Sequence, residues 1–329
     1  MVTLSVKTLL RGVVAGAATF SGWLASLEHQ QRDTLTILCY HRVLPQDRRL
    51  QYFDPQLVVT PEMFDAQCGV LTRHFDVITL ERGLLDWQQG RQSSKPRAAI
   101  TFDDGYRDNE TYAVPILARH GLEATFYVVS GLVGSDEQPW YDRAGRALMQ
   151  LGRDAATEVG RAKGLSPLER GEWLSSLEAE TGSMTPHHDD LIMDEAALRR
   201  LVAAGHEIGS HTVTHPLLDQ LAEPDLNDEV LRSRTMLETA SGAAVSGFCY
   251  PNGNLNEHIK VAVTRGGYAY SVSTSPGVNR RADTDILALK RWFISQDRLT
   301  NPSGAPSDAL FRMEISGLSQ RLFRRETAS

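Results

Sequence analysis

The sequence predicts an α/β fold built on a mainly parallel sheet that closes into a barrel. Short apolar runs alternate with stretches of helical periodicity along most of the 329 residues, which is the pattern of repeated β-α units. Right-handed crossovers between such units cover both faces of the sheet with helices. For six or seven units a barrel is the economical closure, and an open doubly wound sheet is the alternative.

Each expected element has a local cause. The expected helices have start and stop signals: Thr60 before Pro61, Asp194 before an apolar-periodic run, and Gly121 at the end of the helix over 109–120. Further helices are expected over 225–241 and 255–265. The expected strands are short apolar runs at Leu35–Tyr40, Ala98–Phe102, Glu123–Ser130, His206–Ser210, Val245–Tyr250, Tyr268–Ser273 and Ile286–Ile294.

Composition limits the class of protein. The chain has 34 Lys and Arg against 41 Asp and Glu, a formal net charge of −7, and its hydrophobic residues make up 41%. This ordinary globular composition argues against disorder. The acidic balance argues against a nucleic-acid partner, because nucleic-acid binders usually carry a basic field. The three cysteines form no C-x-x-C pair, so we expect buried free thiols.

Three segments stand outside the repeated pattern. Residues 1–31 carry basic residues before an apolar stretch, and three interpretations stay open: a signal-like segment, an amphipathic helix on a membrane surface, or a helix packed on the exterior. Residues 134–190 are expected to form an inserted helical subdomain. Residues 296–329 are expected to form a polar C-terminal tail, which leaves 34–295 as the main domain.

Polar side chains follow three of the expected strands. Asp103 and Asp104 follow one strand, His211 and His215 follow another, and Tyr250 opens a Pro-Asn-Gly turn after a third. The carboxyl ends of parallel strands share one edge of the sheet, where ligands bind. One carboxylate with two imidazoles is the ligand set of an open catalytic zinc site, and the second carboxylate can accept a proton. A backbone N–H in the turn can face a developing oxyanion.

These motifs, TFDDG, HTVTHP and FCYPNG in this order, resemble the polysaccharide deacetylases of carbohydrate esterase family 4, the NodB-homology domain. The resemblance covers residues 34–295 apart from the insertion. It implies a distorted (β/α)7 barrel and removal of acetyl groups from N-acetylated sugars by hydrolysis. It also implies one divalent metal, expected to be zinc, with cobalt, manganese and nickel as alternatives.

The resemblance also assigns roles to single residues. It implies that Asp103 is the general base and that Asp104, His211 and His215 are the metal ligands. It implies that the backbone N–H of Tyr250 helps to hold the oxyanion.

Two features common in the family are absent from this chain. No Arg precedes the Tyr-Pro turn, where the chain reads Ser246-Gly247-Phe248-Cys249, and no His lies in Leu287–Trp292. A subgroup acting on exopolysaccharides is more similar: it has an early strand ending in Tyr-His, as at Tyr40-His41, and a late Leu-x-Arg, as at Leu289-Lys290-Arg291. We therefore expect His41 to be the general acid and Arg291 to orient the catalytic aspartate.

The expected function is metal-dependent de-N-acetylation of a polysaccharide or oligosaccharide in exopolysaccharide biosynthesis. The alternatives are a catalytically inactive carbohydrate-binding relative and an amidohydrolase that acts on a small amide. The complete set of acid and imidazole groups favours an enzyme, because binding alone needs no general base. The expected partners are the N-acetylated substrate and, through residues 1–31, a bacterial inner membrane on its cytoplasmic or periplasmic face.

Overall fold

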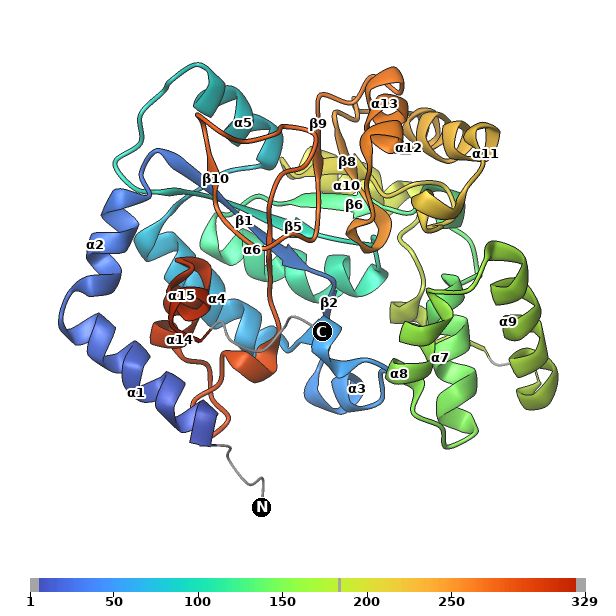
Figure 1. Cartoon of the computed structure of the whole chain (residues 1–329), viewed down its shortest axis with the longest axis horizontal. Coiled ribbons are helices and arrows are strands. Elements are labelled where there is room, and N and C mark those ends of the chain that lie inside the picture. The colour runs from blue at the N-terminus through green and yellow to red at the C-terminus, as the bar shows by residue number, and fades with distance from the viewer. Residues whose placement is uncertain (1–5, 183–184, 324–329) are drawn as a thin grey trace.

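A curled parallel sheet forms the centre of the molecule, as the alternating pattern predicts (Figure 1). The computed structural model describes residues 6–182 and 185–323. The parallel strands run in the order β1 (Thr34–Tyr40), β5 (Arg97–Phe102), β6 (Thr125–Val128), β7 (Glu207–Ser210), β8 (Gly247–Cys249) and β9 (Tyr270–Val272). Shorter strands are β4 (Asp76–Val77) beside β5, β10 (Asn279–Arg280) antiparallel to β1, and the separate pair β2 (Arg42–Val43) and β3 (Val58–Val59).

The segment 286–293 joins the two edges of the sheet. Leu289 donates its N–H to the carbonyl of Ser271 and accepts from the N–H of Ser273, both at 2.9 Å, and so pairs with the β9 edge. Three residues later, β11 (Trp292–Phe293) pairs in parallel with β1. The expected continuous last strand is therefore interrupted, because its first half pairs with one edge and its second half with the other. The sheet closes toward a distorted barrel.

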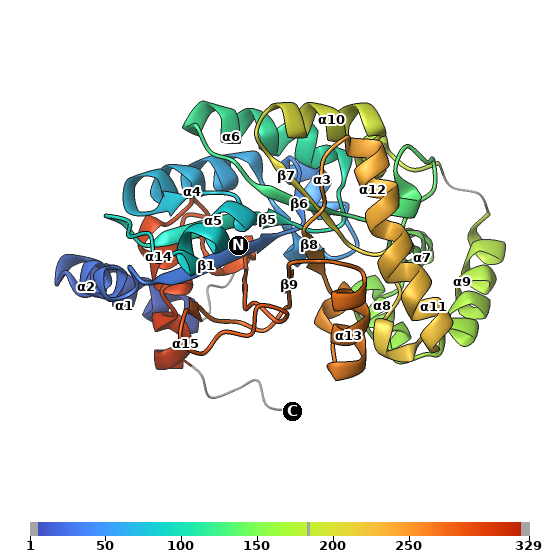
Figure 2. The same ribbon diagram turned by 90° about the horizontal axis from the view of Figure 1, so that it is seen from above.

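Helices cover the outer face of the sheet (Figure 2). Their caps are those predicted: the side chains of Thr60 and Asp194 accept from the backbone N–H of Met63 and Ala197, and Gly121 has φ of 64°. The helices on this face are α4 (Pro61–His74), α6 (Val114–His120), α10 (Glu195–Ala203), α11 (Glu223–Asn227), α12 (Ser233–Ser241) and α13 (Glu257–Arg265). Of the other two, α3 (Gln46–Leu50) follows β2, and α5 (Leu80–Gln88) packs into the cluster on the opposite face of the strands.

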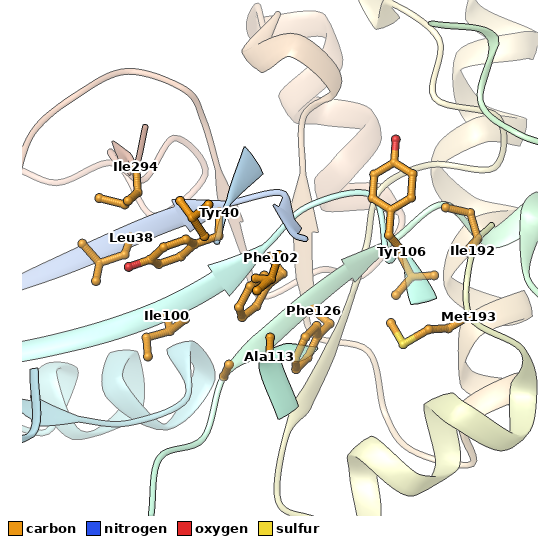
Figure 3. Close-up of a cluster of buried hydrophobic side chains, with 14 of the residues drawn as sticks. Leu38, Tyr40, Ile100, Phe102, Tyr106, Ala113, Phe126, Ile192, Met193 and Ile294 are labelled. Carbon is orange, nitrogen blue, oxygen red and sulfur yellow. The ribbon is translucent and has the colours of Figure 1, made fainter. Parts of the chain in front are cut away.

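The two faces of the strands belong to different hydrophobic clusters. Under the outer helices, Phe102 stacks on Phe126 with ring centroids 5.0 Å apart, and the buried side chains around them are drawn in Figure 3. Alternate residues of the same strands, such as Ile37 and Ala99, belong to a second buried cluster with Leu289. Packing on both faces therefore holds the carboxyl ends of these strands in fixed positions.

The helical insertion and the helices nearest the two termini lie at opposite ends of the molecule (Figures 1 and 2). The insertion is helical as expected and contains α7 (Trp140–Gln150), α8 (Ala155–Ala162) and α9 (Pro167–Thr181). At the other end, α1 (Val6–Phe20) and α2 (Trp23–Gln30) pack against α14 (Asp308–Ile315) and α15 (Leu318–Phe323). Within the described ranges, no helix is long and apolar enough to cross a membrane.

The expectation of a polar tail from residue 296 is wrong for residues 308–323. The charged residues that make this stretch look polar are paired across the interface: Arg312 donates to both carboxylate oxygens of Glu28 at 2.7 and 2.8 Å, and Arg11 donates to Glu314 at 2.8 Å. Leu310 and Met313 are buried between these pairs. Residues 324–329 of the expected tail lie outside the described residues.

Candidate active site

The residues singled out from the sequence meet at one end of the barrel. His41 follows β1, Asp103 and Asp104 follow β5, and His211 follows β7. Parallel pairing from β1 through β9 puts these strand ends on the same side of the sheet. Arg291 comes from the segment that joins the sheet edges, just before β11.

Asp103 and Arg291 form a fully buried, two-pronged ion pair. The Arg291 guanidinium donates to Oδ1 of Asp103 at 2.6 Å and to Oδ2 at 2.7 Å. It also donates to the Ser273 carbonyl at 2.9 Å and to the Thr101 hydroxyl at 3.1 Å, so its own position is fixed. Burial favours a neutral Asp103, but the charge and hydrogen bonds of Arg291 outweigh burial and hold the pKa of Asp103 well below its ordinary value. Asp103 is thus kept ionised.

Two cysteines complete the surroundings of this pair. Cys39 Sγ lies 3.4 Å from Oδ2 of Asp103, and Arg291 donates to Cys249 Sγ at 3.2 Å. Both thiols are buried and free, as expected, and burial raises the pKa of each well above its usual value. They therefore contact the ion pair as neutral thiols, a position that the sequence alone did not reveal.

Asp104, His211 and His215 converge as a candidate metal centre. Nε2 of each histidine lies 3.6 Å from Oδ1 of Asp104. Burial, followed by the charge of Asp103, raises the pKa of Asp104 to about 8. Burial lowers the pKa of both histidines, so they are neutral imidazoles, the form that ligates metal.

The donor set fits a divalent metal. His211 Nδ1 lies 2.8 Å from the Cys249 carbonyl, which fixes the ring and leaves Nε2 facing Asp104. Two other clusters of possible ligands occur among the described residues: Asp103 with Cys39 and His41, and Asp103 with His211 and Cys249. Both clusters depend on Asp103. The Arg291 guanidinium already occupies both oxygens of Asp103, so a cation fits best at Asp104.

The backbone of the motif loops is strained. In the described part of the chain, the non-glycine residues with positive φ are Asp104 (72°), Thr212 (69°), His215 (60°) and Asn252 (57°). All four lie in the three motif loops, and each left-handed residue of this kind costs on the order of 1 kcal/mol or more. Gly105, with φ of 84°, has no room for a Cβ, which would lie 2.8 Å from a Val128 methyl carbon. The strained backbone sets the positions of the side chains that these loops carry.

His41 stands beside the ion pair with its Nε2 4.0 Å from Oδ2 of Asp103. Asn109 holds the backbone of His41 by donating to its carbonyl at 2.9 Å. Burial lowers the pKa of His41 to about 4, although the charge of Asp103 opposes this shift. Its buried Nδ1 has no hydrogen-bond partner within residues 6–182 and 185–323. The imidazole is therefore neutral near pH 7 and within a small movement of Asp103.

Tyr250 lines the cavity, where the sequence places it. Its backbone N–H donates to the Val272 carbonyl at 3.3 Å, because the pairing of β8 with β9 continues one residue past Cys249. Its hydroxyl donates to the Leu287 carbonyl at 2.8 Å. The role of its N–H toward an oxyanion stays a prediction.

A cavity of about 390 Å³ opens above these groups. Its floor contains the acids and histidines of the strand ends, and the helical insertion supplies one wall, including Trp140, Tyr141, Val159 and Lys163. The Tyr141 ring meets His215 edge-on with centroids 5.0 Å apart, and Lys163 Nζ donates to Asn252 Oδ1 at 2.8 Å. Sites of this volume suit a small organic group.

Comparison with known proteins adds the family. The family profile described as Polysaccharide deacetylase matches residues 90–271, more than half of the chain. The chain belongs to the polysaccharide deacetylase family. Enzymes of this family, carbohydrate esterase family 4, are hydrolases that act on carbon–nitrogen bonds and in general depend on a metal.

Relatives of this polysaccharide deacetylase are distant in sequence. YxkH of Bacillus subtilis strain 168, whose name places it provisionally among polysaccharide deacetylases, is 23% identical over 286 residues, 87% of this chain and 79% of its own length. A chitooligosaccharide deacetylase of Bradyrhizobium sp. strain ANU 289 is 30% identical over 101 residues, which span 28% of this chain and 46% of that relative.

Solved structures support the fold. The Streptococcus pyogenes deacetylase PplD in complex with acetate matches 85% of this chain and 98% of its own, with a TM-score of 0.60 and 20% identity. IcaB from Ammonifex degensii matches 81% of this chain and 94% of its own, with a TM-score of 0.57 and 20% identity. At such identities the likeness concerns the fold alone, and it agrees with the NodB-type barrel expected from the motifs.

Proposed function

We propose that this polysaccharide deacetylase removes acetyl groups from N-acetylated sugar units of a polysaccharide or oligosaccharide. In this proposal one divalent metal, zinc in the first instance, is held by Asp104, His211 and His215. The observation that carries the proposal is the pairing of this three-donor cluster with an ionised carboxylate, Asp103, at the floor of one cavity. A simple sugar-binding site needs neither group.

The buried ion pair prepares Asp103 to act as the base. A bound divalent cation would polarise the acetamide carbonyl and make nearby water acidic. Asp103 then accepts the proton of the attacking water, which becomes a hydroxide nucleophile. Arg291 keeps Asp103 ionised and therefore able to accept a proton, although the same pairing makes the carboxylate a weaker base. Arg291 is a positioning residue here, since it holds both oxygens and leaves the carboxylate one orientation.

His41 completes the proposed proton path. The sugar amine must leave with a proton, because an amide anion is far too basic to be expelled. His41 is neutral before the reaction and lies 4.0 Å from the carboxylate that has just taken a proton. In this scheme the proton passes from water to Asp103, then to Nε2 of His41, and finally to the leaving nitrogen, so the enzyme returns to its starting state.

The proposed physiological role is exopolysaccharide biosynthesis. Its support is the pairing of two features of that subgroup, His41 after β1 and Arg291 before β11, on the same carboxylate. They stand in for the Arg and His that many family members carry elsewhere.

A membrane-surface location at the bacterial inner membrane is part of the proposal. The stripe of α1 and α2 that faces away from α14 is apolar and exposed: Val13 is 69%, Phe20 96% and Trp23 45% exposed. Residues 1–27 contain no acidic residue, whereas Lys7 is basic. An apolar stripe with aromatic residues and no negative charge suits the surface of an anionic bilayer.

Vesicle co-sedimentation tests this location. The protein is mixed with phosphatidylcholine vesicles that contain or lack phosphatidylglycerol, and the doubly changed variant Val13→Ser/Phe20→Ser is compared with Leu168→Ser, whose leucine is 72% exposed on the insertion. We expect binding that depends on the anionic lipid and is lost only in the double variant. Equal binding by both variants, or self-association without vesicle binding, would contradict the location.

Acetate release tests the proposed reaction. N-acetylglucosamine oligomers are incubated with metal-stripped protein, with protein after zinc or cobalt is restored, and with Asp103→Asn. Release should require the cation and fall by about 10²–10⁴-fold in Asp103→Asn, whereas Asp225→Asn, an exposed change on α11, should have no effect. Sugar binding without release would support the non-catalytic relative, and neither binding nor release would support the small-amide enzyme.

A further inference from the structure

The loop that carries the two histidines is not a helix, and something must hold its shape. His211 and His215 are four residues apart, yet Thr212 and His215 both have positive φ. Within the loop, the Thr212 hydroxyl donates to the His211 carbonyl at 2.5 Å and accepts from the His215 N–H at 3.0 Å. These bonds shape the two ends of the loop. The N–H groups of Ser130 and Gly131 donate to the carbonyls of Thr212 at 3.0 Å and Val213 at 2.9 Å and tie the carbonyl side of the loop to the segment after β6. The N–H side of its middle needs a separate tie.

Glu229 supplies that tie. One carboxylate oxygen accepts from the backbone N–H of Val213 at 2.7 Å and of Thr214 at 2.9 Å. The other oxygen accepts from the Thr214 hydroxyl at 2.6 Å. A single carboxylate therefore holds the two residues at the centre of the loop, midway between the two histidines. Two successive N–H groups around one anion form the arrangement known as a nest.

The position of Glu229 points to this task and not to an ordinary surface ion pair. Within residues 6–182 and 185–323, no cation lies within ion-pair distance of its carboxylate. It does not line the catalytic cavity, so it has no direct contact with a substrate there. Its bonds go to the histidine loop alone.

The local helix geometry brings Glu229 to the loop. Residues Asp228–Arg232 form a π-helical turn between α11 and α12. The other π-helical turn in the described chain, Asn109–Ala113, follows the Asp103-Asp104-Gly105 loop, and Asn109 at its start donates to the His41 carbonyl. π-Helical turns occur frequently at functional sites. Here each one places a polar side chain behind one of the loops that carry the candidate catalytic groups.

We propose that Glu229 is a positioning residue for the metal centre: its carboxylate fixes the His211–His215 loop so that both imidazoles face Asp104 before a cation binds. This inference rests on the proposed metal site. Partners behind metal-ligating histidines typically change metal affinity by 10- to 100-fold when they are removed. The predicted consequence concerns cation affinity and is independent of substrate.

Cation binding to metal-stripped full-length protein tests the proposal. Zinc affinity is measured by competition with a chromophoric chelator, and the visible spectrum of bound cobalt reports the ligand geometry. Glu229→Ala should bind zinc about 10- to 100-fold more weakly and change the cobalt spectrum. Glu229→Gln should keep most of the affinity, since its amide oxygen can accept from both N–H groups and its NH2 can donate to the Thr214 hydroxyl. Asp228→Ala is the matched control, because Asp228 lies in the same turn and pairs only with Arg232.

The outcomes separate this proposal from the proposed function. If the wild-type protein binds no cation, both are overturned. If the wild type binds zinc and folded Glu229→Ala binds it equally tightly, only the role of Glu229 is overturned. Should Glu229→Ala fail to fold, Thr214→Val decides the question, because it removes only the bond to the second carboxylate oxygen. A loss of affinity no larger than that in Asp228→Ala would then contradict the proposal.

Discussion

The floor and the wall of the catalytic cavity are built differently. The floor consists of charged and imidazole groups at strand ends, and its central Arg291–Asp103 pair is buried and fixed by several bonds. The wall comes from the insertion and is mainly apolar, with Trp140, Tyr141 and Val159 facing the cavity beside one cation, Lys163. The groups able to act on a substrate therefore lie in the floor, while the insertion adds a mainly apolar surface beside them.

The wall is nevertheless firmly attached to the barrel. Asp142 of α7 accepts from the hydroxyls of Tyr52 and Tyr106, both at 2.7 Å. The Arg42 guanidinium lies over both tyrosine rings, at 4.7 and 4.1 Å from their centroids, and is paired with Asp108. The wall is therefore a preformed surface, and changes in it should alter substrate binding before they alter the chemical step.

The largest effect is expected from breaking the floor at Arg291. Arg291→Met leaves a buried carboxylate without its counter-charge, so we expect a loss of about 3–5 kcal/mol in the free energy of unfolding and a loss of turnover of about 10²-fold or more. Urea unfolding and acetate release measure the two effects. Arg199→Met, which removes an exposed pair with Glu195, is the control and should cost less than about 1 kcal/mol. Similar stability losses in both variants would contradict the account of the floor.

His41 separates chemistry from stability within the floor. His41→Gln should lower kcat by about 10²–10⁴-fold with little change in KM, because the proton donor is lost while the cavity keeps its shape. The free energy of unfolding should change by less than about 1 kcal/mol, since the nearest charged atom to the His41 ring, Oδ2 of Asp103, lies 4.0 Å away. Full turnover in this variant would remove His41 from the proton path.

The pH dependence of stability tests a buried histidine at the other end of β7 from the floor residue His211. His206 precedes β7, accepts from the Ala124 N–H at 3.2 Å, and has its pKa lowered by burial to about 4. The unfolded chain takes up this proton near pH 6.5, so stability falls as pH drops from about 6.5 to 4, by roughly 2–3 kcal/mol in total. His206→Gln should lack this component in urea unfolding and keep normal turnover. An identical pH dependence in both proteins would show that His206 is not buried in its neutral form.

The smallest effect is expected from the wall at Lys163. Lys163→Met removes the ammonium group that lines the cavity. The loss of one hydrogen bond from this group to the sugar, worth about 1 kcal/mol, should raise KM for N-acetylglucosamine oligomers by about fivefold with kcat unchanged. Lys95→Met, which affects only a bond to the Thr72 carbonyl, is the control. Steady-state kinetics give both constants. A fall in kcat at constant KM would place Lys163 in the chemistry and end the division between floor and wall.

Local sequence patterns predicted much of the fold and the convergence of the site. The strands before Asp103 and His211 are apolar runs with clear boundaries, and the parallel arrangement alone brings their ends together. The contact of Arg291 with Asp103 was expected from the family resemblance, since the two residues are 188 positions apart and no local pattern connects them.

The features that escaped prediction depend on long-range contacts. Glu229 is one acid among many in a helical stretch, and only the folded loop reveals its three bonds. The C-terminal segment was predicted to be a polar tail because the partners of its charged residues Arg312 and Glu314 lie in α1 and α2, about 300 residues away, and no local pattern reveals them. The bond from the Tyr250 N–H to the Val272 carbonyl also escaped prediction, because the sequence does not show that the strand pairing extends one residue past Cys249.

Zinc titration of metal-stripped protein, with acetate release followed at each addition, tests the central claim most directly. The account predicts that release from N-acetylglucosamine oligomers rises in proportion to added zinc, stops rising at one equivalent per chain, and is absent in His215→Ala at the same zinc concentrations. Full release from protein without any cation, or equal release by His215→Ala, would contradict it.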